Sequence, residues 1–201
     1  MRAWLLDELN GVDHLRLADV ADPVPKSGEA ILELQFAALN PADKYLAERQ
    51  YPLKPALPHV LGRDGIGQVS QLGPGVSGLQ LGDKRAILRG DVGGTRWGTF
   101  AQKVAVPIEN LVEVPAEWND QQAAGATLVY LTAYQALTMW GPLPPRAVVL
   151  ITGASGGVGV ASIQLAAAMG HTVIGLSRSP EKSRQLEQLG AALRALQAGK
   201  Q

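Results

Sequence analysis

The spacing of apolar residues divides the chain into two regions with different patterns. Up to about Pro115, short runs with partly alternating apolar side chains are separated by glycine and proline, as in strands of a sheet with one buried face. The runs expected to form strands are 28–39, 65–72, 84–88 and 98–106. Many short strands joined by Gly/Pro turns predict a compact, barrel-like β domain.

After Pro115 the pattern changes to alternating helices and strands. Asn119 or Asp120 can cap a helix that continues through Leu128–Trp140 and stops at a glycine and several prolines. A β-branched run that suits a buried parallel strand, a helix, a second strand and a third helix are then expected at 147–152, 157–169, 171–177 and 180–189.

Together the two patterns predict an α/β chain with two domains. Residues 1–118 are expected to form the β-rich domain, and residues 119–201 a partial Rossmann domain built on one βαβ unit. The chain has 201 residues, which is enough for one large or two small domains.

The charge and the apolar runs of the sequence argue against nucleic acid and membrane as binding partners. Lys and Arg together number 18, as do Asp and Glu, so the formal net charge is zero and no overall field attracts nucleic acid. No run of about 18 apolar residues predicts a transmembrane helix, and the residues after Met1 do not resemble a signal peptide. We therefore expect a soluble, cytoplasmic protein that binds neither nucleic acid nor membrane.

The chain contains no cysteine, which excludes disulfides and thiolate-ligated metal sites. Its histidines, His14, His59 and His171, lie far apart in the sequence. Zinc held by histidine and carboxylates stays open on ligand chemistry, but we expect no metal and interpret His59 as a loop histidine.

The segment Gly153–Gly159 reads GASGGVG and lies between an expected strand and an expected helix. Aligned to G-x-G-x-x-G, its key positions are Ala154, Gly156 and Gly159, so alanine replaces the first glycine. Gly156 has no Cβ to block a pyrophosphate, and Gly159 allows the helix to pack closely on the strand. The free N–H groups of that helix favour phosphate. A tight turn without a ligand is the alternative.

Cofactor choice depends on the end of the second strand, where NAD-binding proteins place an acidic residue. Here Ser177 stands 18 residues beyond Gly159, and Arg178 and Lys182 follow it. These cations suit the 2′-phosphate of NADPH, so we predict NADPH over NADH. The alternative is a solvated loop in which Lys182 pairs with a nearby acid.

Several short motifs occur in an order that is similar to the zinc-free, quinone-oxidoreductase-like branch of the medium-chain dehydrogenase/reductase superfamily. They are NPADKY (40–45), LGRDGIG (61–67), LGDKR (81–85), GTFAQ (98–102), LTAYQAL (131–137) and the glycine turn. The resemblance implies a GroES-like substrate domain followed by a Rossmann domain. It also implies hydride transfer from NADPH to a quinone, enone or related carbonyl-conjugated acceptor.

The resemblance also suggests roles for single residues. Asn40 and Tyr51 are implied to lie near the nicotinamide or substrate, and to donate hydrogen bonds to the developing enolate or phenolate. Thr132 is implied to contact the nicotinamide side. The pyrophosphate contacts implied are Ser155, Gly156, Gly157 and Val158.

Other interpretations of these residues stay open. Tyr51 can instead be a loop aromatic that covers the cleft, Asp43 a helix cap and Tyr45 a core residue. The zinc-dependent branch carries cysteines and a GHE motif where this chain has Asn40 and Gly62-Arg63-Asp64, so a zinc alcohol dehydrogenase is disfavoured. Asp64 is expected to make a turn or interdomain hydrogen bond.

Proteins of this family are about half as long again. The chain is expected to stop after a single βαβ-α, with a helical or frayed tail from Ala192, so that a two-stranded sheet with exposed apolar faces and weak cofactor binding results. A catalytically inactive truncated remnant is therefore the alternative function. Proteins of this family often dimerise through the edge of the Rossmann sheet. Because the rest of that sheet is expected to be missing, a homodimer is possible but not expected.

Overall fold

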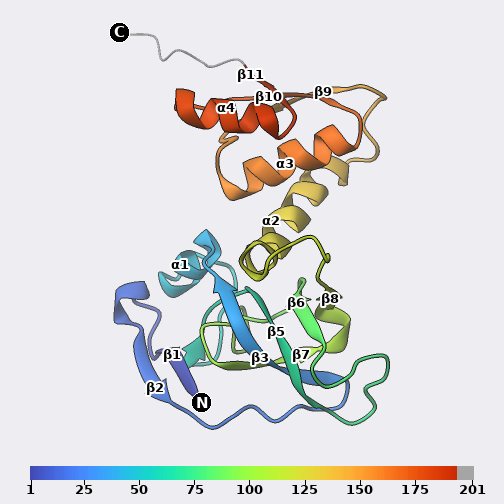
Figure 1. Cartoon of the computed structure of the whole chain (residues 1–201). Helices are drawn as coiled ribbons and strands as arrows, with labels where there is room; N and C mark the ends of the chain where they lie inside the picture. Colours follow the sequence, from blue (N-terminus) through green and yellow to red (C-terminus); the bar gives the residue numbers. More distant parts are fainter. Residues whose placement is uncertain (194–201) are drawn as a thin grey trace. The chain divides into compact units, whose positions relative to one another are not determined.

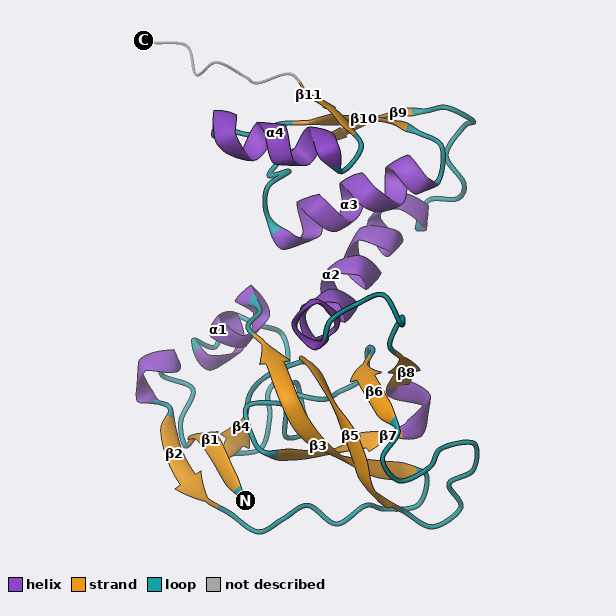
Figure 2. Ribbon diagram, viewed as in Figure 1, coloured by secondary structure: helices purple, strands orange, loops and turns teal. Residues whose placement is uncertain are grey.

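The computed structural model describes residues 1–193, and the chain divides into two compact units (Figure 1). The first is Met1–Leu128, and the second begins at Val129. The change falls within one helix, α2 (Asp120–Thr138), whereas the predicted domain boundary precedes that helix. Helices and strands are both present, as predicted for an α/β chain (Figure 2).

The first unit is β-rich, as its glycine- and proline-punctuated pattern predicts. A five-stranded antiparallel sheet has the order β7-β3-β5-β6-β8, and a three-stranded antiparallel sheet has the order β2-β1-β4. Its elements are β1 (Arg2–Leu6), a 3-10 helix (Val12–His14), β2 (Arg16–Asp19), β3 (Glu29–Ala38), α1 (Pro41–Ala47), β4 (His59–Val60), β5 (Asp64–Leu72), β6 (Lys84–Ile87), β7 (Lys103–Pro107), a second 3-10 helix (Ile108–Asn110) and β8 (Leu111–Glu113).

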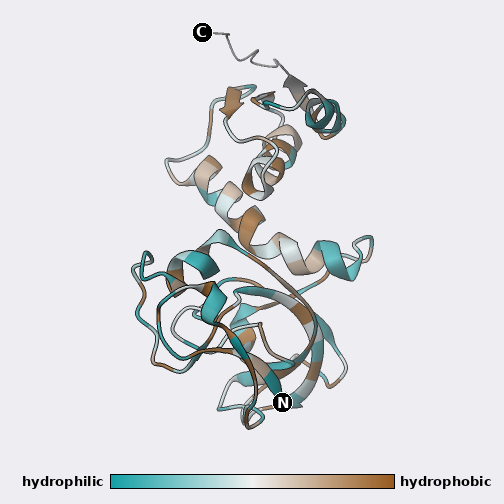
Figure 3. Ribbon diagram, turned by 90° about the vertical axis from the view of Figure 1, so that its left-hand side faces the viewer, coloured by the Kyte–Doolittle hydropathy of each residue, from teal (hydrophilic) through white to brown (hydrophobic). Residues whose placement is uncertain are grey.

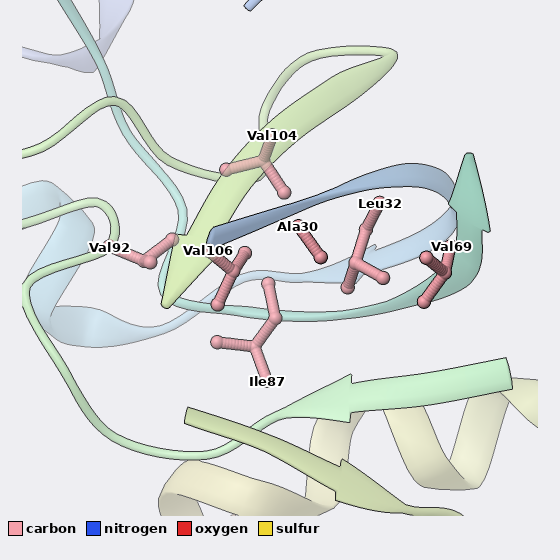
Figure 4. Packing of buried hydrophobic residues seen from close by; sticks show 7 residues of the cluster. All are labelled: Ala30, Leu32, Val69, Ile87, Val92, Val104 and Val106. Carbon is pink, nitrogen blue, oxygen red and sulfur yellow. The ribbon is translucent and has the colours of Figure 1, made fainter. Parts of the chain in front are cut away.

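Small and branched apolar residues from several strands fill the main core of this unit. The cluster consists of Ala30, Leu32, Val69, Ile87, Val92, Val104 and Val106, whose side chains converge in Figure 4. The expected strands at 28–39, 65–72 and 84–88 correspond to β3, β5 and β6. β1, β2, β4 and β8 were not expected, because they are short and lack clear alternation.

The second unit contains a parallel sheet of order β11-β10-β9. Beyond the last turns of α2, its elements are β9 (Val148–Ile151), α3 (Gly157–Ala168), β10 (Thr172–Gly175), α4 (Pro180–Gln188) and β11 (Ala191–Leu193). Ile151, Val173 and Ala191 from the strands pack against Ile163 of α3 and Leu186 of α4. The rest of α4 is largely hydrophilic (Figure 3).

The expected tail from Ala192 is wrong for its first two residues. Ala192 and Leu193 belong to β11, which pairs with β10 through Ile174↔Ala192 and Gly175↔Leu193. The sheet therefore has three strands and not two, because β10 offers an unpaired parallel edge to the chain that leaves α4. The remainder of the expected tail, 194–201, lies outside the described residues.

The prediction of a buried strand at 147–152 is also wrong in part. In β9 only Ile151 is buried, Val149 is half-buried, and Val148 and Leu150 are 65% and 59% exposed. Successive strand residues point to opposite faces, and α3 and α4 both contribute to the cluster that contains Val149 and Ile151. The opposite face of β9 is therefore the exposed one. No helix among residues 1–193 is long and apolar enough to cross a membrane.

Candidate functional sites in the two units

Asn40 stands between β3 and α1, where the chain turns from strand to helix. Pro41 occupies the first helical position, which its fixed φ favours. The backbone N–H of Asn40 donates to Oδ2 of Asp43 (2.8 Å), and the Asp43 N–H donates to the Asn40 carbonyl oxygen (3.0 Å). The expected helix-capping role of Asp43 is thus confirmed. Its Oδ1 also accepts the backbone N–H of Gly62 (3.2 Å).

Asp64 fixes the side chain of Asn40. Asn40 Nδ2 donates to Asp64 Oδ2 (3.1 Å), while Asp64 Oδ1 accepts from Thr127 Oγ1 (2.7 Å) and from the Leu128 N–H (3.1 Å). The hydrogen-bonding role expected for Asp64 is therefore confirmed, and its carboxylate ties the start of β5 to α2. An amide nitrogen carries two N–H donors, so the Asn40 side chain retains a second donor.

Burial raises the pKa of both aspartates. Removal from water raises the pKa of Asp43 to about 6, although the N–H groups of Asn40 and Gly62 oppose the shift. Burial also raises the pKa of Asp64, against hydrogen bonds from Thr127 and Asn40. Desolvation disfavours the charged carboxylate in each case.

Tyr51 is half-buried and packs against the cluster that contains Leu6, Leu46 and Leu61. Arg63 Nη1 donates to the Tyr51 hydroxyl oxygen (2.9 Å), and the guanidinium carbon lies 5.5 Å from the ring centroid. The hydroxyl oxygen thus accepts from Arg63, and the Tyr51 proton is left to point at another acceptor. No role for Arg63 was predicted from the sequence; its signal was a cation next to Asp64, in a run (LGRDGIG) whose other residues are uncharged.

Two neighbouring expectations are wrong. Tyr45 is 46% exposed and not in the core, because the buried face of α1 is formed by Asp43, Leu46 and Ala47. His59 is a fully buried residue of β4 and not a loop histidine. Burial lowers the pKa of His59, which favours the neutral ring.

In the second unit, the glycine turn joins β9 to α3. Gly153 has a left-handed backbone (φ 63°), which glycine adopts without strain. A Cβ on Gly159 would lie 2.4 Å from the Gly153 carbonyl oxygen and 2.7 Å from Ala154 Cα. The close packing expected of Gly159 is therefore present in the structure.

The alanine at the first fingerprint position is buried without displacing the turn. Ala154 is fully buried, and a Cβ placed on Gly175 of β10 would approach its methyl group to 3.2 Å. Because Gly175 has no side chain, the methyl group of Ala154 has room beside β10.

The outer side of the turn is open. A Cβ on Gly156 would meet only the Gly153 carbonyl oxygen, at 3.4 Å, and Ser155, Gly156, Gly157 and Val158 are all exposed. No side chain caps the N-terminus of α3, so its first N–H groups lack intrahelical partners. This cradle fits a phosphate group in shape and in polarity.

Ser177, Arg178 and Lys182 lie beyond the end of β10. Ser177 is buried, and its hydroxyl oxygen accepts the Ser179 N–H (3.3 Å), which shapes the loop before α4. Arg178 and Lys182 are exposed, and among residues 1–193 neither forms an ion pair with a carboxylate. The alternative in which Lys182 pairs with a nearby acid is not what the structure shows.

Thr132 lies on the part of α2 that belongs to the second unit, where it is exposed. It follows Val129 by three residues and thus shares its face of the helix. Val129 Cγ1 lies 3.2 Å from the position a Cβ would take on Gly157, so this face borders the glycine turn. Within residues 1–193, no three His, Asp or Glu side chains gather to hold a metal ion.

Comparisons with known proteins identify relatives that match both the first unit and the second. Residues 26–116 match the alcohol dehydrogenase GroES-like domain. The chain is 33% identical over 192 residues to quinone oxidoreductase of Lama guanicoe, which covers 95% of this chain and 57% of that protein. The chain thus spans little more than half the length of this relative.

Solved structures show the same likeness. An NAD-dependent alcohol dehydrogenase superposes with a TM-score of 0.90 at 33% identity, covering 98% of this chain and 64% of its own. A mycobacterial protein solved in complex with NADPH superposes with a TM-score of 0.84 at 28% identity. The match covers 99% of this chain and 60% of that protein.

The first unit thus resembles a GroES-like β domain, and the second contains a parallel α/β sheet with a glycine turn between β9 and α3. By these comparisons the chain is similar to quinone-oxidoreductase-like members of the medium-chain dehydrogenase/reductase superfamily, and its residues 26–116 match the GroES-like domain family.

Proposed function

We propose that the chain is the nucleotide-binding and substrate-binding part of a zinc-independent oxidoreductase that transfers hydride from NADPH to a quinone, an enone or a related carbonyl-conjugated acceptor. The observation that carries this proposal is the open glycine turn before an uncapped helix in the second unit. Its exposed backbone at Ser155, Gly156 and Gly157 would hold the pyrophosphate.

Arg178 and Lys182 support NADPH over NADH. Both are exposed cations beyond the end of β10, and neither is neutralised by a carboxylate of the described residues. A guanidinium can donate two parallel hydrogen bonds to a 2′-phosphate, and an ammonium adds a point charge. Thr132 would contact the nicotinamide side of the cofactor.

Asn40 and Tyr51 are the proposed donors to the acceptor oxygen. NADPH would supply the hydride, and the acceptor also gains one proton, so that a quinone becomes a hydroquinone. The second N–H of Asn40 and the hydroxyl proton of Tyr51 can stabilise the developing negative charge. Tyr51 or solvent would deliver the proton.

A pair of glycine substitutions tests the phosphate site. Gly156→Ala adds a methyl group that the fold tolerates, because the nearest atom lies 3.4 Å away, but that group would stand where the phosphate approaches. We expect about a tenfold or greater loss of NADPH affinity by calorimetry, with thermal stability nearly unchanged. NADPH affinity in Gly156→Ala equal to that of the unmodified chain would contradict the proposed site.

Arg178→Ala tests the cofactor preference. It should weaken NADPH binding about 5- to 100-fold while changing NADH binding little, because only NADPH carries the 2′-phosphate. Arg184→Ala is the matched control, since Arg184 is also an exposed arginine, on α4. Equal weakening of both nucleotides by Arg178→Ala would mean that Arg178 does not bind the 2′-phosphate.

Catalysis is tested by NADPH oxidation with simple quinones and enones after treatment with a metal chelator. Turnover that survives the chelator supports the proposed zinc-independent reaction. Tight NADPH binding without turnover across many acceptors would instead identify a binding module without catalysis.

A further inference from the structure

A small cavity opens beside Tyr51 in the first unit, and its polar lining is cationic. It measures about 280 Å³ and is lined by Leu9, Arg49, Tyr51, Leu53 and Lys54. Two apolar side chains and an aromatic ring thus share the cavity with two positive charges. Its size suits one small charged group and the atoms next to it.

The positive charges at this cavity are not neutralised by neighbouring acids. Arg49 and Lys54 form no ion pair with any carboxylate of residues 1–193. Asp7 is paired with Arg16, and Glu48 is paired with Lys44 (3.7 Å). Glu8 and Asp13, the other acids close to Leu9 in the sequence, form no ion pair with either cavity cation in the described part of the chain. The cavity is therefore lined by two cationic side chains that no carboxylate of the described residues pairs with.

Arg49 occupies a backbone position that favours glycine. It follows the C-terminal cap of α1 and has a left-handed φ of 60°, as residues that end helices often do. Its Nε donates to the Leu9 carbonyl oxygen (3.1 Å). A guanidinium has five N–H donors, so the others remain able to bind an anion.

Arg63 extends the positive charge to the hydroxyl of Tyr51. Its Nη1 bonds to the hydroxyl oxygen of Tyr51, which lines the cavity. The proposed proton donor thus borders a cavity that carries unpaired cations.

We propose that this cavity is a subsite for an anionic group, a carboxylate or a phosphate, carried by the acceptor that Tyr51 contacts. The inference rests on the proposed oxidoreductase function and narrows its substrates to acceptors with a negatively charged substituent. Arg49 would bind the anion with its fork of N–H donors, and Lys54 would add a point charge.

A matched pair of acceptors tests the subsite in the kinetic assay. One is a benzoquinone with a propionate side chain, and the other is its methyl ester, which has the same ring and no charge. The acid should have a KM about five- to tenfold below that of the ester, the range expected for a partly exposed charged contact. Arg49→Gly and Lys54→Gln should each remove most of this ratio, mainly through the KM of the acid.

Arg89→Gly is the control, because Arg89 is also an exposed arginine with a left-handed φ (67°) but does not line the cavity. It should leave the ratio of the two KM values unchanged. Arg49→Gly places glycine where the backbone favours it, so a loss of folding is not expected. A ratio that survives both cavity substitutions would overturn the proposal.

A binding experiment separates this proposal from the failure of the oxidoreductase function. The ¹⁵N-labelled chain is titrated, without NADPH, with the propionate quinone, with its ester and with inorganic phosphate, and the Arg49 Nε–H resonance is followed. A saturable shift with the propionate compound identifies a carboxylate site, and a shift with phosphate alone identifies a phosphate site. Either result supports the subsite even if no turnover occurs. Absence of a shift with both anions overturns it.

Discussion

The two units bury their apolar residues in different ways. In the first unit, the side chains of Leu32, Ile66 and Ile87 are fully buried. They come from three neighbouring strands of the five-stranded sheet, β3, β5 and β6. In the second, Ile151 is buried against the helices while Leu150, its neighbour in β9, is exposed. The first unit thus has an enclosed core, whereas the second buries one face of its sheet. A parallel strand is normally covered on both faces, so the two units should respond differently to truncation of their apolar side chains.

The largest expected contrast is between two leucines. Leu32→Ala removes a fully buried side chain from the first core and should lower the free energy of unfolding by about 2 to 5 kcal/mol. Leu150→Ala removes an exposed side chain of β9 and should change it by no more than about 0.5 kcal/mol. Denaturant titration followed by hydrogen exchange of peptides from each unit measures both effects. Equal losses would show that Leu150 is covered in solution.

A pair of helical glycines gives the next contrast. Gly159→Ala places a methyl group 2.4 Å from a backbone carbonyl oxygen and should destabilise the second unit by about 1 to 3 kcal/mol. Gly125 in α2 is the control, because a Cβ there would meet only Ala38 Cβ, at 3.8 Å. Gly125→Ala should stabilise the first unit by about 0.5 to 1 kcal/mol. Thermal unfolding of both variants checks these opposite signs.

Between about pH 4 and 6, the first unit should show a pH dependence of stability that arises from Asp43 and Asp64. The folded chain holds the proton on Asp43 up to about pH 6, whereas the unfolded chain loses it near pH 4. The stabilisation from the Asp43 proton is complete below the unfolded pKa and is lost as the pH rises through about 6, by on the order of 3 kcal/mol. The raised pKa of Asp64 acts with the same sign.

Asp43→Asn should flatten this slope between pH 4 and 6, in addition to any constant loss from its hydrogen bonds. Asp13→Asn, at an exposed position, is the matched control and should keep the slope. Unfolding curves at several pH values, read from exchange in each unit, provide the measurement. An unchanged slope in Asp43→Asn would assign the pH dependence to another group.

The sequence pattern predicted long elements better than short ones. β3, β5, α3 and α4 lie close to their predicted ranges, because each has a clear period or a recognisable start and stop. β11 was missed, since Ala191–Leu193 is short and its strand character comes only from pairing with β10. The exposure of Leu150 was missed because a run of apolar residues carries no information on which face the helices cover.

In the candidate site, too, the local features were predicted from the sequence and the long-range contacts were not. The glycine turn was found from local spacing, and its open outer face needs only a strand, a turn and a helix. The links from Asp64 to Asn40 and to Thr127 join residues far apart in the chain, and so does the contact of Arg63 with Tyr51. Spacing cannot show which donor meets which acceptor in such long-range pairs.

Ala154 and Gly175 carry a consequence for how the dinucleotide fingerprint is defined. The alanine methyl occupies space that a side chain at Gly175 would need, so the two positions share one volume across neighbouring elements. Exchanging them, with Ala154→Gly and Gly175→Ala together, should be tolerated better than Gly175→Ala alone, which makes the pair thermodynamically coupled. The fingerprint is then a motif of two strands, in which a missing glycine at the turn is compensated by one in β10.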